Sequence, residues 1–419
     1  MTTFALLSTL VTLAALFGLI SHRVLKLPTS IGTMILSLCG AAALIAGGHV
    51  APEFRTAAAR IVGGIDFNQV VLHGMLAFLL FAGALQLDLK QLAREKLPVL
   101  SLSLAATALS TVFVAVLFKG ALLAVGIPMS VMGALLFGAL ISPTDPIAVL
   151  DMLRRVGAPA ALESQLAGES LFNDGVGAVI FLALLEASTS GALPAPGRFL
   201  FLLLLKAGGG IALGCLLGYL TYRLLCTVDS YRIEVTLTLA LAMGGYALAD
   251  ALHLSAPLEA VAAGLLVSGR ARGTAMSEQT REHVDRFWEL LEDIMNVVLF
   301  LLLGLELLVV PPSSRFLLAG LLAIPAVLLA RWGSVSITVH ALSAVKRRVP
   351  GSITVLTWGG LRGGLAVALA LSLPHGNGLQ RGLLLVTYVV VVFSILVQGL
   401  TIAPLLRRLG LQSHSAPES

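Results

Sequence analysis

Four polar residues inside one apolar stretch have the side chains needed to bind or move ions. They are Glu169, Ser170, Asn173 and Asp174, and the chain continues after Gly175 with residues that are almost all apolar. Positions four apart lie on the same side of a helix, so these residues form one polar stripe. Ionised carboxylates are costly in hydrocarbon, so the stripe is expected to face a bundle interior or a water-filled cavity. The default hypothesis there is an ion or proton pathway.

Within the stripe, Asp174 is the strongest candidate for direct chemistry. Desolvation favours the neutral form of a carboxyl group, so a buried aspartate can exchange a proton for a cation. The protonated and cation-bound forms then exclude each other. Ser170, one turn earlier, is a candidate oxygen ligand for the cation. The structural alternatives are a carboxylate hydrogen-bonded for helix packing and a serine bonded to its own helix.

The composition indicates that these residues belong to an all-α polytopic membrane protein. Hydrophobic residues make up 58% of the chain and charged residues 12%, the latter about half of the share in soluble domains. The basic residues behind the net charge of +5 are scattered among loops, which argues against nucleic-acid binding. The loops are too short for a soluble catalytic domain, so we expect neither an enzyme nor a cofactor.

Hydropathy predicts about thirteen membrane spans within a single transmembrane domain over 1–410, followed by a short cytoplasmic tail over 411–419. Transporters are commonly built from inverted repeats. Spans one to six and eight to thirteen form two such six-helix repeats, about 1–190 and 230–410, with span seven as linker. The predicted spans are 4–21, 29–47, 70–87, 98–118, 129–150, 161–187, 199–225, 233–252, 256–269, 287–309, 316–342, 351–373 and 383–405.

The distribution of basic residues predicts the orientation of the chain. Alternate loops carry about eighteen of the 27 Lys and Arg residues on one side and about six on the other, and the richer side is expected to be cytoplasmic. This places the N-terminus outside and the C-terminus in the cytoplasm, as an odd number of spans requires. We expect a multi-pass protein of the cell (inner) membrane.

Two of the predicted spans are interrupted, each at the fifth helix of its repeat. The first break is Ser142-Pro143-Thr144-Asp145-Pro146. Because proline has no backbone N–H, carbonyl groups one turn earlier have no helical hydrogen-bond donor. Free carbonyls can coordinate a cation, and Thr144 can add a carbonyl or a hydroxyl. Asp145 is either the N-cap of a new half-helix or a direct cation ligand. The second break is the glycine-rich run 359–364.

Arg362, within the second break, is the predicted partner of Glu169. A guanidinium holds a carboxylate bidentately and stays protonated, so we expect this ion pair to support two helices across the site. The alternative is that the two side chains extend separately to the membrane–water interface. Lys206 and Arg331 are further intramembrane cations whose partners the sequence does not reveal, and no role is assigned to them.

The sequence resembles the monovalent cation/proton antiporters that include NhaP-type and animal sodium/proton exchangers. Besides the break at 142–146, the run Gly168-Glu169-Ser170-Leu171-Phe172-Asn173-Asp174-Gly175 matches this family. The remaining matching stretches are Phe287-Trp288-Glu289-Leu290, Gly304-Leu305-Glu306-Leu307 and Trp358-Gly359-Gly360-Leu361-Arg362-Gly363-Gly364.

The resemblance implies a homodimer in which two discontinuous helices cross in each protomer. It implies that Asp174 binds the cation or the proton, with Ser170 and the Thr144 carbonyl as co-ligands. It also implies sodium transport for pH homeostasis, and Asn173 before Asp174 implies electroneutral exchange of one Na⁺ (or Li⁺ or K⁺) for one H⁺. Many relatives place Glu after Phe in the third span, whereas Phe81 is followed here by Ala82, which removes a carboxylate co-ligand.

Other functions remain as alternatives. The nearest is a K⁺/H⁺ antiporter of the same architecture. A passive cation channel would use the same polar stripe without coupled exchange. An intramembrane protease is disfavoured because the aspartates at 145 and 174 lack the sequence settings of aspartyl proteases, and the chain has no His-Glu-x-x-His.

Overall fold

A computed structural model describes residues 3–47, 53, 56, 62, 64, 66–67, 69–189, 196–271, 276–308, 313–344, 349–374 and 378–411, and in these residues the regular structure is helical. The tail from 412 to 419 and the basic residues 346–348 lie outside the described residues. The long helices from the N-terminus to the first interruption are α1 (Thr3–Ile20), α2 (Thr29–Gly47), α4 (Leu76–Gln86), α7 (Thr107–Ala124) and α8 (Val131–Ile141).

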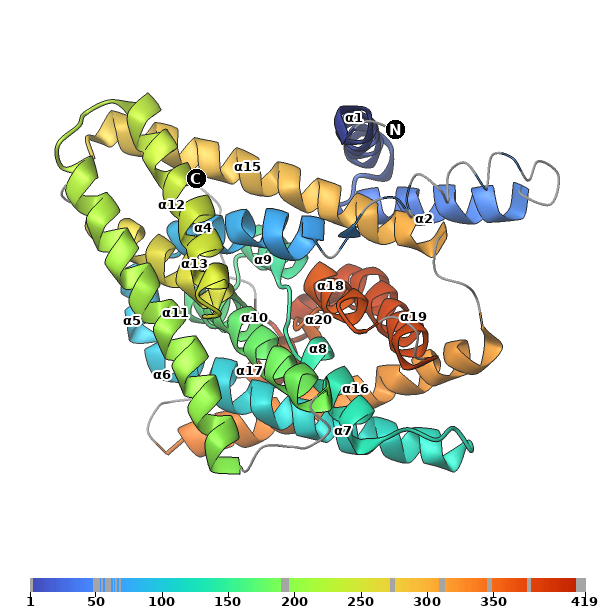
Figure 1. Cartoon of the computed structure of the whole chain (residues 1–419). Helices are drawn as coiled ribbons and strands as arrows, with labels where there is room; N and C mark the ends of the chain where they lie inside the picture. Colours follow the sequence, from blue (N-terminus) through green and yellow to red (C-terminus); the bar gives the residue numbers. More distant parts are fainter. Residues whose placement is uncertain are drawn as a thin grey trace.

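The rest of the chain continues in the same way (Figure 1). The later helices are α9 (Ile147–Arg155), α10 (Ala160–Thr189), α11 (Pro196–Leu225), α12 (Tyr231–Ala251), α13 (Ala256–Leu266), α15 (Glu278–Leu305), α16 (Ser314–Leu342), α17 (Ser352–Trp358), α18 (Gly364–Leu371), α19 (Gly378–Phe393) and α20 (Gly399–Arg408). Shorter helical segments are η1 (Ser21–Leu25), η2 (Gln69–Met75), α5 (Leu89–Arg94), α6 (Lys96–Ser101), η3 (Leu102–Ala106), η4 (Val267–Ala271), η5 (Glu306–Leu308) and η6 (Ser394–Gln398).

The helices account for every predicted span. Among the described residues, 9 helical segments are long and apolar enough to cross a membrane. The other predicted spans are the two interrupted ones (α8 with α9, and α17 with α18), the short α13, and α15, whose first half is rich in charged residues. The all-helical fold is confirmed, while the division into repeats at 1–190 and 230–410 stays a prediction.

The two interrupted helices cross at their breaks. The backbone N–H of Asp145, between α8 and α9, donates a hydrogen bond of 2.8 Å to the carbonyl of Leu361, between α17 and α18. Prolines end the helical pattern in the first break and glycines allow close approach in the second. As a result, four half-helix ends meet in the middle of the protein, and their backbone groups lack hydrogen-bond partners within their own helices.

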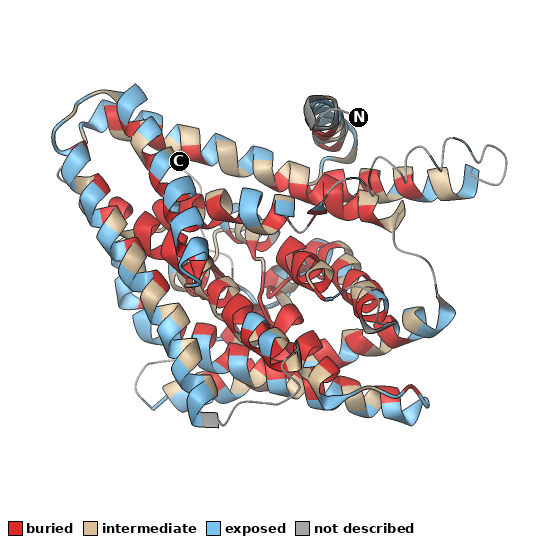
Figure 2. Ribbon diagram, in the orientation of Figure 1, coloured by how far each residue is buried: buried red, intermediate tan, exposed pale blue. Residues whose placement is uncertain are grey.

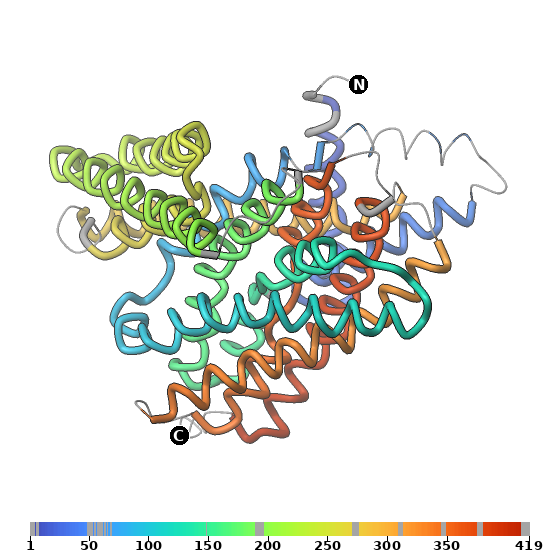
Figure 3. Tube along the Cα trace, turned by 60° about the horizontal axis from the view of Figure 1, so that its bottom comes forward, coloured from blue at the N-terminus to red at the C-terminus, as the bar shows by residue number. Residues whose placement is uncertain are grey.

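A glycine stripe joins α11 to α13. This stripe on α11 consists of three glycines spaced four residues apart, Gly210, Gly214 and Gly218. A Cβ atom at Gly214 would lie 2.3 Å from the carbonyl oxygen of Glu259. Small residues at this spacing let two helix backbones approach closely. In Figures 2 and 3, α11 and α12 lie at one side of the molecule with much of α11 exposed, while α10 is buried at the centre.

Candidate ion-binding site

The unbroken helix α10 carries the predicted polar stripe past the crossing point. Glu169 and Asn173 are fully buried and Ser170 nearly so, whereas Asp174 is half-buried. Gly177, one turn further, makes room for the first break, because a Cβ there would lie 2.4 Å from the Cγ of Pro143. The stripe is therefore held directly against the interrupted helix α8–α9.

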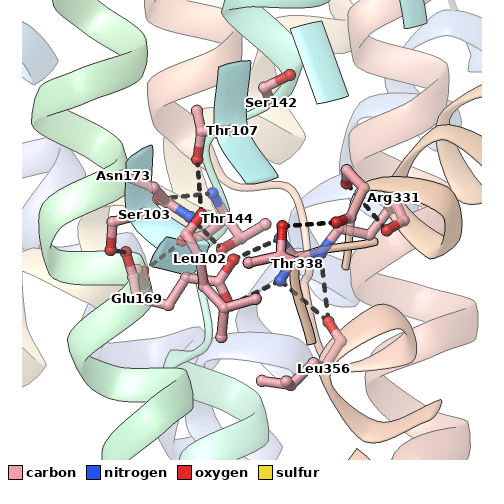
Figure 4. Close-up of polar contacts among 12 residues, drawn as sticks. Leu102, Ser103, Thr107, Ser142, Thr144, Glu169, Asn173, Arg331, Thr338 and Leu356 are labelled. Atoms are coloured by element: carbon pink, nitrogen blue, oxygen red, sulfur yellow. Dashed lines mark hydrogen bonds and ion pairs between the residues drawn. The ribbon is translucent and has the colours of Figure 1, made fainter. Parts of the chain in front are cut away.

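Thr144 links that break to the stripe through hydrogen bonds (Figure 4). Its backbone N–H donates to Asn173 Oδ1 at 3.2 Å, and Asn173 Nδ2 donates to Thr144 Oγ1 at 2.8 Å. The Ser170 hydroxyl donates to the Thr144 carbonyl oxygen. The predicted residues Thr144, Ser170 and Asn173 are thus brought together, and the carbonyl of Thr144 lies at the site as an oxygen that can accept further contacts.

Asp145 lies between two helix N-termini. Its Oδ1 accepts the backbone N–H of Ile147, the first residue of α9, at 3.2 Å. Its Oδ2 is close to Gly363, the residue before α18: a Cβ atom added to Gly363 would lie 2.3 Å from this oxygen. Helix N-termini favour negative charge. Pro146, and not Asp145, is the N-cap of α9, but Asp145 still accepts a hydrogen bond from the first turn, and its role as helix support or cation ligand stays a prediction.

The predicted pair of Glu169 with Arg362 is wrong. Arg362 is buried, but its Nη1 donates to the carbonyl oxygens of Ser142 at 2.6 Å and Pro143 at 2.9 Å. These carbonyls follow the end of α8, where backbone acceptors lack helical partners. The guanidinium therefore neutralises the negative end of a half-helix.

Arg331 on α16 is the partner of Glu169 (Figure 4). Its Nη1 and Nη2 contact the two carboxylate oxygens, the second at 2.9 Å. The same guanidinium donates to the carbonyl oxygen of Leu356, near the end of α17, at 3.1 and 3.3 Å. The sequence placed Glu169, Arg331 and Arg362 within predicted spans, but the choice between the two arginines depends on which helices are neighbours of α10.

Asp174 and Asp145 both line a cavity of about 810 Å³. The cavity also takes in Ser170 and Thr144 and reaches exposed residues such as Asp151 and Arg154. Among the described residues, none donates a hydrogen bond to the Asp174 carboxylate. Asp174 is half-buried, accessible from the cavity and close to the oxygens of Ser170 and Thr144. Such a carboxylate can hold a cation or a proton.

Ala82 does not face this cavity. It is fully buried in an apolar cluster with Phe81 and Leu85, and the cavity wall on α4 is formed instead by residues that include Gly83 and Gln86. A carboxylate at position 82 would therefore need a different side-chain direction to act as co-ligand.

Lys206, left without a role by the sequence, forms an ion pair with Glu186 at 3.1 Å.

Sequence reasoning missed part of the wall of the cavity that Asp174 lines. Glu292 on α15 lines the cavity, and Gln86 Nε2 on α4 donates to its Oε2 at 2.5 Å. The signal available was the spacing of Glu289, Glu292 and Asn296, which fall on one face of a helix. Nothing in the sequence alone indicated that this face and Asp174 share a cavity.

Crossed, interrupted helices around a buried acidic site define a class of protein, the secondary transporters. The comparison with known families is more specific. The family described as "Sodium/hydrogen exchanger, transmembrane" matches residues 11–408, so the chain belongs to the sodium/hydrogen exchanger family. This is a family of multi-pass membrane transporters and not of enzymes.

Named relatives agree with this assignment. The chain is 41% identical over 410 residues to the Na⁺/H⁺ antiporter NhaP of Pseudomonas aeruginosa, covering 96% of each chain. It is 32% identical to the Na⁺/H⁺ antiporter NhaH of Halobacillus dabanensis, over 93% of this chain and 94% of the relative. The sodium proton antiporter MjNhaP1 of Methanocaldococcus jannaschii has the same fold, with a TM-score of 0.77 at 20% identity over 97% of this chain and 98% of the other.

Proposed function

We propose that this protein exchanges Na⁺ for H⁺ across the membrane by alternating access, with Asp174 binding either the cation or the proton. The observation that carries this proposal is the Asp174 carboxylate in the cavity, with no hydrogen-bond donor among the described residues, beside the crossing of two interrupted helices. The names of the relatives, all Na⁺/H⁺ antiporters, support the choice of cation.

Ser170 and Thr144 are the proposed co-ligands. The Ser170 hydroxyl donates to the Thr144 carbonyl, which leaves lone pairs on both oxygens for a cation. Hard cations prefer such oxygen ligands. In the proton-loaded form the Asp174 carboxyl no longer attracts a cation, so the two substrates compete for one site.

The charges around Asp174 favour an electroneutral exchange of one cation for one proton. Asn173 is neutral and uses both amide atoms to hold Thr144. Glu169 is balanced by Arg331, and Asp145 accepts a hydrogen bond from the backbone N–H of Ile147 at the start of α9. Asp174 is therefore the one carboxylate of this cluster without a structural partner, and one titrating group exchanges one charge for one charge.

We propose the orientation and assembly that the sequence led us to expect. The surplus of basic residues in alternate loops supports a cytoplasmic C-terminus. The cavity reaches Arg154 and Arg155 in the last turn of α9, which leads into one of those basic loops, so the proposed orientation opens the cavity to the cytoplasm. The exposed apolar face of α11 is compatible with a homodimer in the cell membrane, which we propose as the working assembly. The transported ions are the proposed substrates, and no cofactor is needed.

Proton flux in proteoliposomes tests this function. We expect Na⁺ to dissipate an imposed pH gradient, Asp174→Asn to abolish that dissipation, and a clamped membrane potential to leave it unchanged. Asp151→Asn is the matched control, because it removes a carboxylate from the exposed end of the same cavity. Thermal unfolding of each purified variant checks that it is folded.

Several results would contradict the proposal. Flux that persists in Asp174→Asn removes Asp174 from its role, and flux that depends on the potential removes electroneutrality. Dissipation by K⁺ but not Na⁺ makes the protein a K⁺/H⁺ antiporter. Uncoupled cation flux would indicate a channel.

A further inference from the structure

A second wall of the cavity that Asp174 lines carries a polar face of its own. It belongs to α15, which packs mainly against α2 and α4, whereas Asp174 lies on α10. Glu289, Glu292 and Asn296 of this helix all line the cavity. Their spacing of three and four residues places them on one side of α15.

Glu292 is held in place at this wall. Gln86 Nε2 on α4 donates a hydrogen bond of 2.5 Å to Glu292 Oε2, so the carboxylate is fixed between two helices. The other carboxylate oxygen keeps its lone pairs. Glu292 is half-buried, whereas Glu289, one turn earlier, is exposed.

Asn296 provides a second and independent observation. It lies one turn deeper than Glu292 and is only 4% exposed, yet within the described part of the chain its Oδ1 accepts no hydrogen bond. A buried amide oxygen without a hydrogen-bond partner is energetically unfavourable. A cation in the cavity would supply the missing partner.

From these contacts we propose a second cation subsite formed by the Glu292 carboxylate and Asn296 Oδ1, in the cavity that Asp174 also lines. It rests on the proposed function and extends it, because it gives the same monovalent cation a binding position before Asp174. Two protein oxygens and water make a weak site. Its effect is to raise the cation concentration beside Asp174, as negatively charged clefts do.

The subsite predicts a specific pattern in transport kinetics. Glu292→Gln keeps the shape of the side chain but removes its charge, and we expect the KM for cytoplasmic Na⁺ to rise roughly threefold to tenfold with kcat little changed. Asn296→Leu, which removes the oxygen at similar volume, should raise KM in the same way. Glu289→Gln and Asp293→Asn are matched controls, since each removes one charge from the same cavity wall.

Direct binding separates the subsite from the transport proposal. In the Asp174→Asn background, Na⁺ binding to the purified protein is measured with radioactive sodium, and choline replaces Na⁺ as control. We expect weak Na⁺ binding to remain and to disappear when Glu292→Gln is added, whatever the flux assay says about Asp174. The Asn296→Leu change keeps the test decisive if Glu292→Gln does not fold.

Two outcomes would overturn the subsite. One is equal KM changes in Glu292→Gln, Glu289→Gln and Asp293→Asn, which would reduce the effect to the general field of the cavity. The other is an Asp174→Asn protein that binds no Na⁺, or that binds it equally well with and without the carboxylate of Glu292.

Discussion

Two buried arginines meet the site, and each satisfies the end of a different half-helix. Arg362 donates to carbonyls that follow α8, and Arg331 donates to the Leu356 carbonyl near the end of α17. Helix C-termini carry partial negative charge, so each guanidinium lies where the backbone favours a cation. Only Arg331 also contacts a carboxylate, that of Glu169.

This arrangement predicts strong coupling between Glu169 and Arg331. Removing either partner leaves a buried charge uncompensated, so Glu169→Gln or Arg331→Met alone should destabilise the protein by about 3–5 kcal/mol. The double variant should lose much less than the sum. Thermal unfolding of the purified variants measures the cycle, and the same cycle with Arg362→Met in place of Arg331→Met serves as control. Coupling of Glu169 to Arg362 that equals or exceeds its coupling to Arg331 would contradict the pairing described here.

The individual helices are positioned by small residues where their backbones approach. At Gly363 the neighbour is the Asp145 carboxylate, at Gly177 it is the Pro143 ring, and at Gly214 it is the Glu259 carbonyl. In lipid, helices associate through close packing because no hydrophobic force favours one apolar contact over another. The glycines therefore determine which helices touch.

The packing of α11 on α13 can be tested with two glycines of the same helix. In Gly214→Ala the new Cβ would lie 2.3 Å from a carbonyl oxygen, whereas in Gly208→Ala it would meet nothing within 4 Å. We expect Gly214→Ala to destabilise the protein by about 1–3 kcal/mol and Gly208→Ala to be neutral or stabilising by up to about 1 kcal/mol. The midpoint of thermal unfolding in detergent reports both. Equal effects of the two changes would exclude a close α11–α13 contact.

At the scale of the whole molecule, the cavity links the crossing point to one surface. Its inner end contains Asp174 and the first break, and its outer part contains exposed residues of α9 and α15. The cavity walls come from several helices, among them α4, α9, α10, α15 and α18. Alternating access requires such walls to move relative to each other.

The sidedness of this opening gives a prediction for the intact protein. A cysteine introduced by Asp293→Cys, with Cys39, Cys215 and Cys226 replaced by serine, should react with a membrane-impermeant thiol reagent only from the cytoplasmic side. The positive-inside rule places the neighbouring basic loops there. Labelling of right-side-out and inverted vesicles measures the difference, and Lys119→Cys, near the end of α7 that is predicted to lie outside, is the control. Labelling of Asp293→Cys from outside alone would reverse the proposed topology.

The sequence by itself determined the helices, their breaks and the polar stripe. These features are local properties of the chain: hydrophobicity over about twenty residues, interruptions by proline and glycine, and the spacing of four residues between Ser170 and Asp174. They predicted the membrane fold, the two interruptions and the polar stripe, and the motifs led to the family that the comparisons confirm. The crossing of the interrupted helices and the pairing of Ser170 with Thr144 were expected from the family resemblance. The roles assigned to these residues in transport stay predictions.

Tertiary structure decided which buried groups became partners. Arg331, and not Arg362, reaches Glu169, Ala82 faces an apolar cluster, and Glu292 shares a cavity with Asp174 although they lie on different helices. The physical reason is that a helix fixes the direction of a side chain relative to its own axis only. Which neighbour it meets depends on how the helices pack, and that is set by contacts between residues far apart in the sequence.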